Sequence, residues 1–423
     1  MNRKLAFLPL LLMLSSILLS ACSGLLSLED EPASGAFGPQ YSSPERQMRT
    51  FESLWKNMED SYIYYDSAGV NWNSVHEKYV NKIKGGLDTE QFTALLKGLE
   101  TELPEGGVVY QSRPERVETD ISNASVPAAI EGIGAILNFE EKDQPHLVVM
   151  SVIEGSPAEA AGLKAHDSIM TIDDKPITVE EGANATRRIR GAAGSSVTLG
   201  VRSPGEQERS IKIKRAKITG SPKLQAYNIV GTDYAYLLFP PVEYQGLDQD
   251  VFNSLKTLAA DRELNGLILD LRIASATPQW PLETLLTIFQ NGKIGEFYNR
   301  SKRSALEVKG QDVAGSQTMP LVVLVGEKTQ GFAEIFAAGL QLNKRAVIVG
   351  EKTPGAVETQ AVFYLPDGSR FFVESTSFKL ANGEELGNTG VVPDVSVSGR
   401  WEEIDPNHDP VLDKAIEILE KTK

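Results

Sequence analysis

Cys22 is the residue whose chemistry follows most directly from its place in the sequence. It is the only cysteine in the chain, and it ends the run Leu19-Ser20-Ala21-Cys22. Arg3 and Lys4 precede an apolar stretch over residues 5–19, which suits a signal-peptide core and is short for a bilayer span. This pattern looks like a bacterial lipoprotein signal, so we expect lipid attachment at Cys22. The alternative is an ordinary secretory signal with a chance cysteine.

The remaining side chains exclude several other classes of chemistry. The histidines, His76, His146, His166 and His408, are scattered and have no metal-ligand spacing. There is no glycine-rich phosphate loop, so we expect neither a metal nor another cofactor. The net charge of −15 includes no basic stripe that could bind nucleic acid.

A glycine-rich run marks a candidate binding site for a peptide. It reads Glu131-Gly132-Ile133-Gly134-Ala135-Ile136 and is followed by an apolar strand at residues 147–150. A short helix then begins at Ser156-Pro157 and ends at Gly162, and a second helix is expected over residues 178–190.

This order of elements resembles a PDZ domain of the bacterial protease type. Small residues at Gly132, Gly134 and Ala135 would let backbone N–H groups point inward and hold a peptide's terminal carboxylate, while the peptide adds as an extra strand. The candidate peptide-binding residues are Gly132, Ile133, Gly134, Ala135 and Ile136. The alternative is a tight turn without a ligand. His166 stands where such domains usually have glycine, which should alter a turn and leave the groove intact.

The regions before and after the PDZ-like segment differ in their predicted secondary structure. Three amphipathic helices are expected before residue 104, with caps at Ser43 and Asp88. After residue 231, buried strands alternate with helices, as in an α/β layer structure. We therefore predict a multidomain α+β protein. Its segments are a signal peptide (1–22), a flexible tether (23–44), a helical domain (45–120), a PDZ-like domain (121–218) and an α/β core with a C-terminal helix (219–423).

The last part resembles the C-terminal processing peptidases, also called tail-specific proteases. The matching segments are Leu267-Ile268-Leu269-Asp270-Leu271-Arg272, residues 345–353, residues 365–369 and Gly390-Val391-Val392-Pro393-Asp394. The helical and PDZ-like parts occur in the family's order, so the resemblance covers nearly the whole mature chain. It implies a core of the ClpP/crotonase type.

In that family a serine attacks the peptide carbonyl and a lysine acts as its base. Aligned on Glu334, the serine position is Gly331. Aligned on Thr353-Pro354-Gly355, the lysine position is Ala356. Gln360 matches a glutamine that orients the lysine, and it has no lysine to orient.

Two further catalytic features of the family are also absent. A related branch uses a histidine at the position that Gly107 fills, and the glycine turn of the oxyanion hole is replaced by Ile273-Ala274-Ser275-Ala276-Thr277. Losing nucleophile and base costs on the order of a millionfold in rate. A shifted pair, Thr329 with Lys352, is an alternative that we weigh lower, because catalysis tolerates little misplacement.

The sequence thus predicts a pseudopeptidase that is lipid-anchored outside the cytoplasm, at the cell membrane or the outer membrane of a bacterium. Its partners would be C-terminal or extended segments of envelope proteins. Homo- or hetero-oligomers with active relatives are a further hypothesis. The alternatives are an active serine-type endopeptidase with non-standard catalytic residues and a structural envelope protein.

Overall fold

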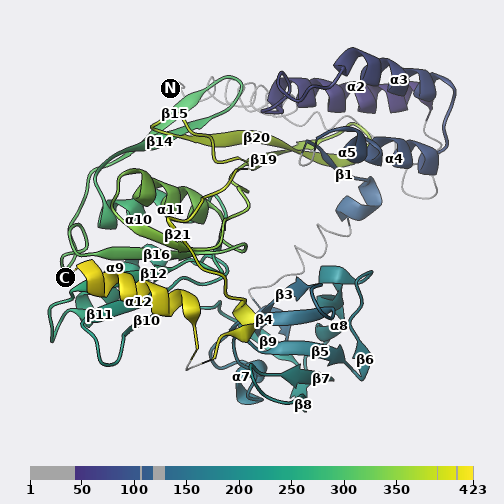
Figure 1. The fold of residues 1–423 in the computed structure, drawn as a ribbon. Helices are drawn as coiled ribbons and strands as arrows, with labels where there is room; N and C mark the ends of the chain where they lie inside the picture. The colour runs from purple at the N-terminus through teal and green to yellow at the C-terminus, as the bar shows by residue number, and fades with distance from the viewer. Residues whose placement is uncertain (1–42, 105–106, 118–128, 388, 406–407, 423) are drawn as a thin grey trace, which may run out of the picture.

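The structure is a computed structural model that describes residues 43–104, 107–117, 129–387, 389–405 and 408–422 (Figure 1). The predicted signal peptide, Cys22 and most of the tether lie outside these ranges. No helix within them is long and apolar enough to cross a membrane. The chain forms a helical end, a PDZ domain and an α/β core, as predicted.

The helical end consists of α2 (Pro44–Ser61), α3 (Trp72–Lys84), α4 (Thr89–Lys97) and α5 (Leu99–Glu102). The predicted caps are present, because the Ser43 hydroxyl accepts from the Arg46 N–H and Asp88 forms a capping box with Gln91. These helices have no separate core. They pack on a sheet built from distant strands, β1 (Val109–Gln111), β19 (Thr359–Tyr364), β20 (Arg370–Leu380), β14 (Gly292–Tyr298) and β15 (Arg303–Val308).

The PDZ domain spans β2 (Ala129–Gly132) to β9 (Ala216–Thr219). Its main sheet has the order β3 (Ala135–Glu140), β4 (His146–Val152), β5 (Ser168–Ile172), β7 (Ser196–Arg202), β8 (Arg209–Lys214), with β6 (Lys175–Pro176) on β5. The first helix is α7 (Pro157–Ala160). The expected second helix is shorter than predicted, with a 3₁₀ turn η2 (Gly182–Ala185) leading into α8 (Thr186–Ile189). Gly182 has φ +50°, a left-handed conformation that interrupts helical geometry.

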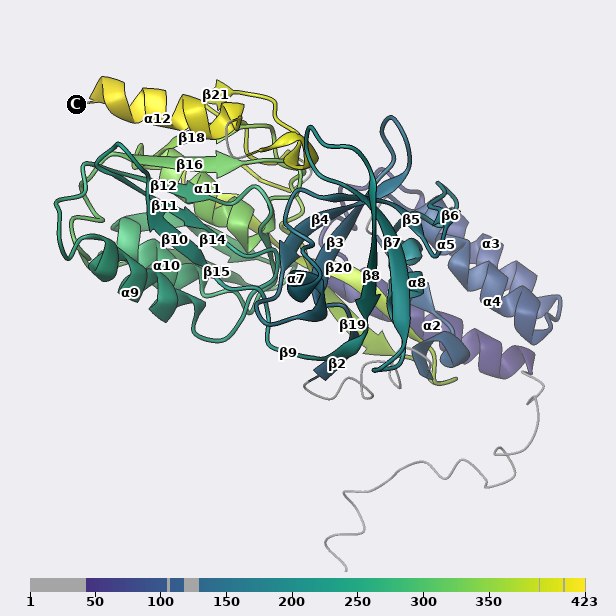
Figure 2. The same cartoon turned by 90° about the horizontal axis from the view of Figure 1, so that it is seen from below.

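The core is a sheet of order β10 (Gln225–Asn228), β11 (Tyr234–Leu238), β12 (Gly266–Asp270), β16 (Leu321–Val325), β18 (Val347–Gly350), β21 (Val395–Ser396), parallel except for β10. One face packs against α9 (Leu247–Leu258), α10 (Leu282–Phe289) and α11 (Phe332–Leu342), and the other against α12 (Pro410–Thr422) (Figure 2). The carboxyl ends of the parallel strands meet at one edge, which is where α/β folds place their sites.

A buried ion triad fastens α12 to this edge. Arg272, just after β12, contacts Asp270 at 2.6 Å and Asp409 at 2.7 Å. Asp409 also caps α12, accepting from the Leu412 N–H at 3.1 Å. Burial opposes ionisation of Asp409, but the Arg272 guanidinium outweighs burial and holds the pKa of that carboxyl below its usual value. These ion pairs therefore fix the position of Arg272, from which residues 273–277 continue.

Candidate functional site

Gly331 lies at the sheet edge, at the start of α11, where the family resemblance puts the nucleophile. Its backbone has φ +66° and ψ −129°, a combination that is essentially restricted to glycine. It belongs to a short strand, β17 (Gln330–Gly331). Position 331 therefore has the backbone of a sharp strand-to-helix turn and no side chain to attack a substrate.

The space beside Gly331 is filled by the chain itself. The short strand β13 (Ser275–Ala276) pairs in parallel with β17, with Ala276 opposite Gly331. A Cβ on residue 331 would lie 2.1 Å from the carbonyl oxygen of Ala276, closer than real Cβ atoms come to any atom. The segment that replaces the family's glycine turn therefore fills the space in which a side chain at residue 331 would lie.

One carboxylate, that of Glu334, accepts hydrogen bonds from the backbone at or next to positions 331 and 356. Glu334 is fully buried and accepts from the N–H of Gly331 at 3.1 Å, the N–H of Gly355 at 2.6 Å and the Thr353 hydroxyl at 2.5 Å. Burial raises the pKa of the Glu334 carboxyl, and these hydrogen bonds oppose the increase. Ala356 follows Gly355 directly, so the structure brings positions 331 and 356 to the same anchor. Ala356 and Gln360 are both exposed.

The alternative pair does not form a catalytic dyad in this structure. Thr329 is fully buried; its hydroxyl donates to the Leu271 carbonyl at 2.8 Å and accepts from the Gly326 N–H at 2.9 Å. Both hydrogen bonds join the Thr329 side chain to backbone groups and so stabilise the loop. Lys352 is exposed, whereas the lysine base of the family is a desolvated one. Neither residue has the setting of a nucleophile or its base.

Gly107 lies apart from this edge, between α5 and β1 at the helical end (Figure 1). A Cβ there would meet the Pro104 carbonyl oxygen at 2.9 Å and the Leu103 Cβ at 3.3 Å. The position is buried against the helical core, and a histidine would not fit without local rearrangement.

The PDZ run forms a tight turn between β2 and β3. Gly134 has φ +85°, and a Cβ there would lie 2.3 Å from the Cβ of Ser156, so only glycine fits. The carbonyls of Ile133 and Gly134 accept from Ala158 and Ile153. Among the turn, loop and cap hydrogen bonds of the described residues, the N–H groups of Ile133 and Gly134 donate to no carbonyl oxygen. Two adjacent unsatisfied backbone donors are the arrangement that binds a carboxylate.

β3 continues from this turn as an edge strand of its sheet, with η2 beside it. The side chains of Ala135, Leu137 and Phe139 pack into the PDZ core. Ile136 points the other way and packs with Val148, Met150 and Ile273, where the PDZ domain meets the core. The side chain of Ile136 therefore faces away from the side chains of Ala135 and Leu137, because alternate strand residues face opposite sides.

The contact between PDZ domain and core is a feature that sequence reasoning missed. His166, at the position that usually holds glycine, has φ +75°, and its ring lies 4.2 Å from that of Trp401 in η3 (Trp401–Glu403). His166 Nδ1 is 2.7 Å from the Trp401 carbonyl oxygen. The departure at His166 was visible in the sequence, but its partner was not, because Trp401 lies more than two hundred residues away along the chain.

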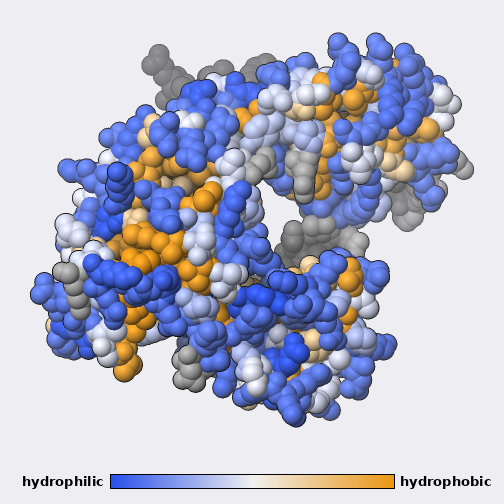
Figure 3. All heavy atoms as spheres, in the orientation of Figure 1, coloured by the Kyte–Doolittle hydropathy of each residue, from blue (hydrophilic) through white to orange (hydrophobic). Residues whose placement is uncertain are grey.

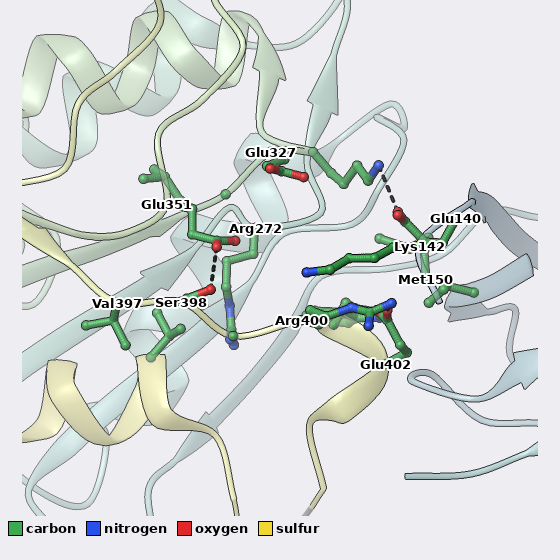
Figure 4. Close-up of a pocket in the computed structure, with 17 residues that line it drawn as sticks. Glu140, Lys142, Met150, Arg272, Glu327, Glu351, Val397, Ser398, Arg400 and Glu402 are labelled. Carbon is green, nitrogen blue, oxygen red and sulfur yellow. Dashed lines mark hydrogen bonds and ion pairs between the residues drawn. The ribbon is translucent and has the colours of Figure 1, made fainter. Parts of the chain in front are cut away.

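A cavity of about 190 Å³ opens beside this contact, between the β3–β4 turn and the carboxyl ends of β16 and β18 (Figure 4). Its charged groups are of both signs, and several pair with one another, as Lys328 does with Glu140 at 2.9 Å. No group of acidic, histidine or cysteine side chains among the described residues could hold a metal ion.

Comparisons with known proteins agree with this architecture. A family model described as Peptidase family S41 matches residues 233–397, a PDZ domain model matches 148–203 and a Tricorn protease C1 domain model matches 44–97. A solved structure titled photosystem II D1 C-terminal processing protease has a TM-score of 0.61 at 21% identity, over 88% of this chain and 97% of that chain. The fold is therefore that of an S41-type peptidase with an inserted PDZ domain.

Sequence relatives define the family more closely. A carboxyl-terminal-processing protease of Picosynechococcus sp. is 30% identical over 362 residues, 80% of each chain. The carboxy-terminal processing protease CtpA of Bacillus subtilis is 29% identical, over 78% of this chain and 68% of the relative. The chain belongs to the carboxyl-terminal-processing protease family, as the sequence motifs predicted.

Proposed function

We propose that this protein is a peptide-binding pseudopeptidase, tethered outside the cytoplasm through Cys22. The observation that carries the proposal is the pairing of β13 with β17. It fills the nucleophile position with the Ala276 carbonyl and leaves no room for a side chain at Gly331. If serine had only been replaced by a smaller side chain, the space for the serine side chain would remain open. In this structure the backbone of Ala276 fills that space.

Binding would take place in the PDZ domain. The free N–H groups of Ile133 and Gly134 would receive a terminal carboxylate, and the open edge of β3 would pair with the residues before it. Hydrogen bonds to a charged group contribute about 1.5–3 kcal/mol each. The expected partners are exposed C-terminal segments of envelope proteins.

The second candidate is an active endopeptidase, which the names of the related carboxyl-terminal-processing proteases favour. It would require β13 to leave Gly331 and another residue to act as nucleophile. A third candidate, a structural envelope protein, would keep the same fold with an unused groove.

The test uses residues 43–423, which include every described element. Two fluorescent peptides of identical sequence, one with a free C-terminal carboxylate and one amidated, are titrated against the protein, and each mixture is analysed by mass spectrometry. Preferential binding of the free carboxylate without hydrolysis supports the proposal. Hydrolysis supports the endopeptidase, and equal or absent binding supports the structural role.

A further inference from the structure

The cavity between the PDZ domain and the core lies at the carboxyl ends of β16 and β18, and we call it the junction cavity (Figure 4). Its PDZ wall comes from β3, β4 and the turn between them, and its core wall comes mainly from the segments that follow β12, β16, β18 and β21. Its volume of about 190 Å³ suits a molecule the size of an amino acid, because pockets for larger ligands measure about 300–1,000 Å³.

Part of the lining of the junction cavity is apolar. Val148 and Met150 of β4 and Val325 of β16 are all buried. Val397 and Trp401 add apolar surface that is partly exposed. An aliphatic group placed against these side chains would be removed from water, which favours binding.

Four basic and four acidic side chains line the same cavity, and most of them are already paired. Three ion pairs account for the paired groups: Arg272 with Asp270 at 2.6 Å, Lys328 with Glu140 at 2.9 Å, and Arg400 with Glu402. Their charges are therefore compensated within the protein.

The other three charged groups have no opposite charge beside them. The amine of Lys142, in the β3–β4 turn, and the carboxylate of Glu327, after β16, form no hydrogen bond or ion pair with any described residue. Glu351, after β18, accepts a hydrogen bond from the Ser398 hydroxyl at 2.6 Å and has no cationic partner among the described residues. In Figure 4 Lys142 reaches into the cavity from one side, while Glu327 and Glu351 lie on the other.

We propose that the junction cavity binds a free α-amino acid with an aliphatic side chain. The carboxylate of the ligand pairs with the Lys142 amine, its ammonium group pairs with Glu351 and Glu327, and its side chain packs against the apolar lining. Both ends of the ligand then form charge-assisted hydrogen bonds, which are stronger than neutral ones.

The distribution of charge disfavours small ligands that carry a single charge. An anion would be attracted by Lys142 and repelled by Glu327 and Glu351, whereas a simple amine would be attracted by the two carboxylates and repelled by Lys142. A zwitterion meets the opposite charge at each of its ends.

A bound amino acid would also connect the two domains. Lys142 belongs to the PDZ domain, and Glu327 and Glu351 belong to the core. The ligand would thus add to the hydrogen bond from Trp401 to the Val149 carbonyl oxygen, which already joins the domains. A ligand that binds only the docked arrangement stabilises that arrangement. The peptide groove takes no part in this site.

The experiment titrates residues 43–423 with three probes in an isothermal titration calorimeter. The probes are L-leucine, N-acetyl-L-leucine, which lacks the ammonium group, and L-leucinamide, which lacks the carboxylate. Leucine should bind with a Kd on the order of 1 mM or tighter, and each blocked compound should bind at least about tenfold more weakly. Equal binding of the three probes, or no saturation by leucine at about 10 mM, would overturn the proposal.

Two variants assign each end of the ligand to its partner. Lys142→Gln should weaken leucine binding about tenfold and leave leucinamide binding unchanged, because leucinamide has no carboxylate to lose. Glu351→Gln should weaken leucine binding and leave N-acetyl-leucine binding unchanged. Lys212→Gln, which changes an exposed lysine of β8 outside the cavity, is the matched control and should bind leucine as the natural protein does.

The variants also separate this site from the PDZ turn. Leucine could place its carboxylate on the N–H groups of Ile133 and Gly134, but such binding would not depend on Lys142 or Glu351. Leucine binding that Lys142→Gln and Glu351→Gln both leave unchanged would therefore overturn the proposal. Failure of the groove to bind peptides would not affect the result, because no peptide is used.

Discussion

The carbonyl oxygen of Ala276 occupies the space into which a side chain at Gly331 would project. The two residues form one parallel bridge between β13 and β17, and a Cβ on Gly331 would lie 2.1 Å from that oxygen. In an active relative a serine must be free at this position, whereas here glycine is required by backbone conformation and by lack of space.

Gly331→Ala should therefore destabilise the protein by about 2–4 kcal/mol, through strain at positive φ and overpacking against Ala276. Gly292→Ala is the matched control, because Gly292 has φ +109° and open space around its Cβ. It should cost about 1 kcal/mol. Urea unfolding of both variants measures the difference, and equal losses would contradict the closed bridge.

Restoring the dyad alone should not restore activity. In the double variant Gly331→Ser, Ala356→Lys, the serine must displace β13 before its hydroxyl can reach a substrate. We expect no casein cleavage above that of the natural protein. Replacing residues 273–277 with the family's Asn-x-Gly-Gly turn as well is the variant in which activity could appear. Turnover by the double variant alone would mean that β13 moves easily.

Glu334 should contribute strongly to stability. Glu334→Ala would leave the Thr353 hydroxyl and the N–H groups of Gly331 and Gly355 without their buried acceptor, at a cost of about 3 kcal/mol or more. Denaturant unfolding at neutral pH measures this loss.

The pH dependence gives a second test of Glu334. Because burial raises its pKa in the folded state, the folded protein holds this proton more tightly than the unfolded chain. The free energy of unfolding should therefore fall as the pH rises through the raised pKa. Glu334→Gln should remove that slope, and an unchanged slope would argue against the assignment.

Trp401 should be the main attachment of the PDZ domain. Trp401→Ala removes the ring contact with His166 and the hydrogen bond to Val149, and should weaken docking by about 3–5 kcal/mol. Hydrogen exchange in residues 147–152 should rise sharply. Trp72→Ala, which removes a ring stacked on Tyr65 in the helical end, should leave that segment protected.

The sequence predicted local features more accurately than distant contacts. The caps at Ser43 and Asp88 depend on neighbouring residues, so they can be predicted from the sequence alone. The absence of serine at 331 and lysine at 356 was equally plain. The closure by Ala276 could not be inferred, because it depends on where residues 273–277 run in space. The sheet that joins β1 to β19 and β20 escaped prediction for the same reason.

The conformation of the PDZ turn follows in part from the sequence. Gly134 and Ser156 belong to one local pattern, and their close approach explains that pattern. The orientation of Ile136 toward the core depends on how the PDZ domain docks, which involves Ile273 and Trp401. In Figure 3 an opening remains between the helical end and the PDZ domain, another feature that follows from packing between distant segments.

We propose that the protein binds a peptide's C-terminus and does not cut it. The most direct measurement titrates residues 43–423 with a peptide that carries a free carboxylate and with its amidated form, followed by mass spectrometry of each mixture. We predict that amidation weakens binding roughly 10- to 100-fold and that both peptides are recovered intact. Hydrolysis of either peptide by the natural protein would contradict the proposal that it binds peptides without cutting them.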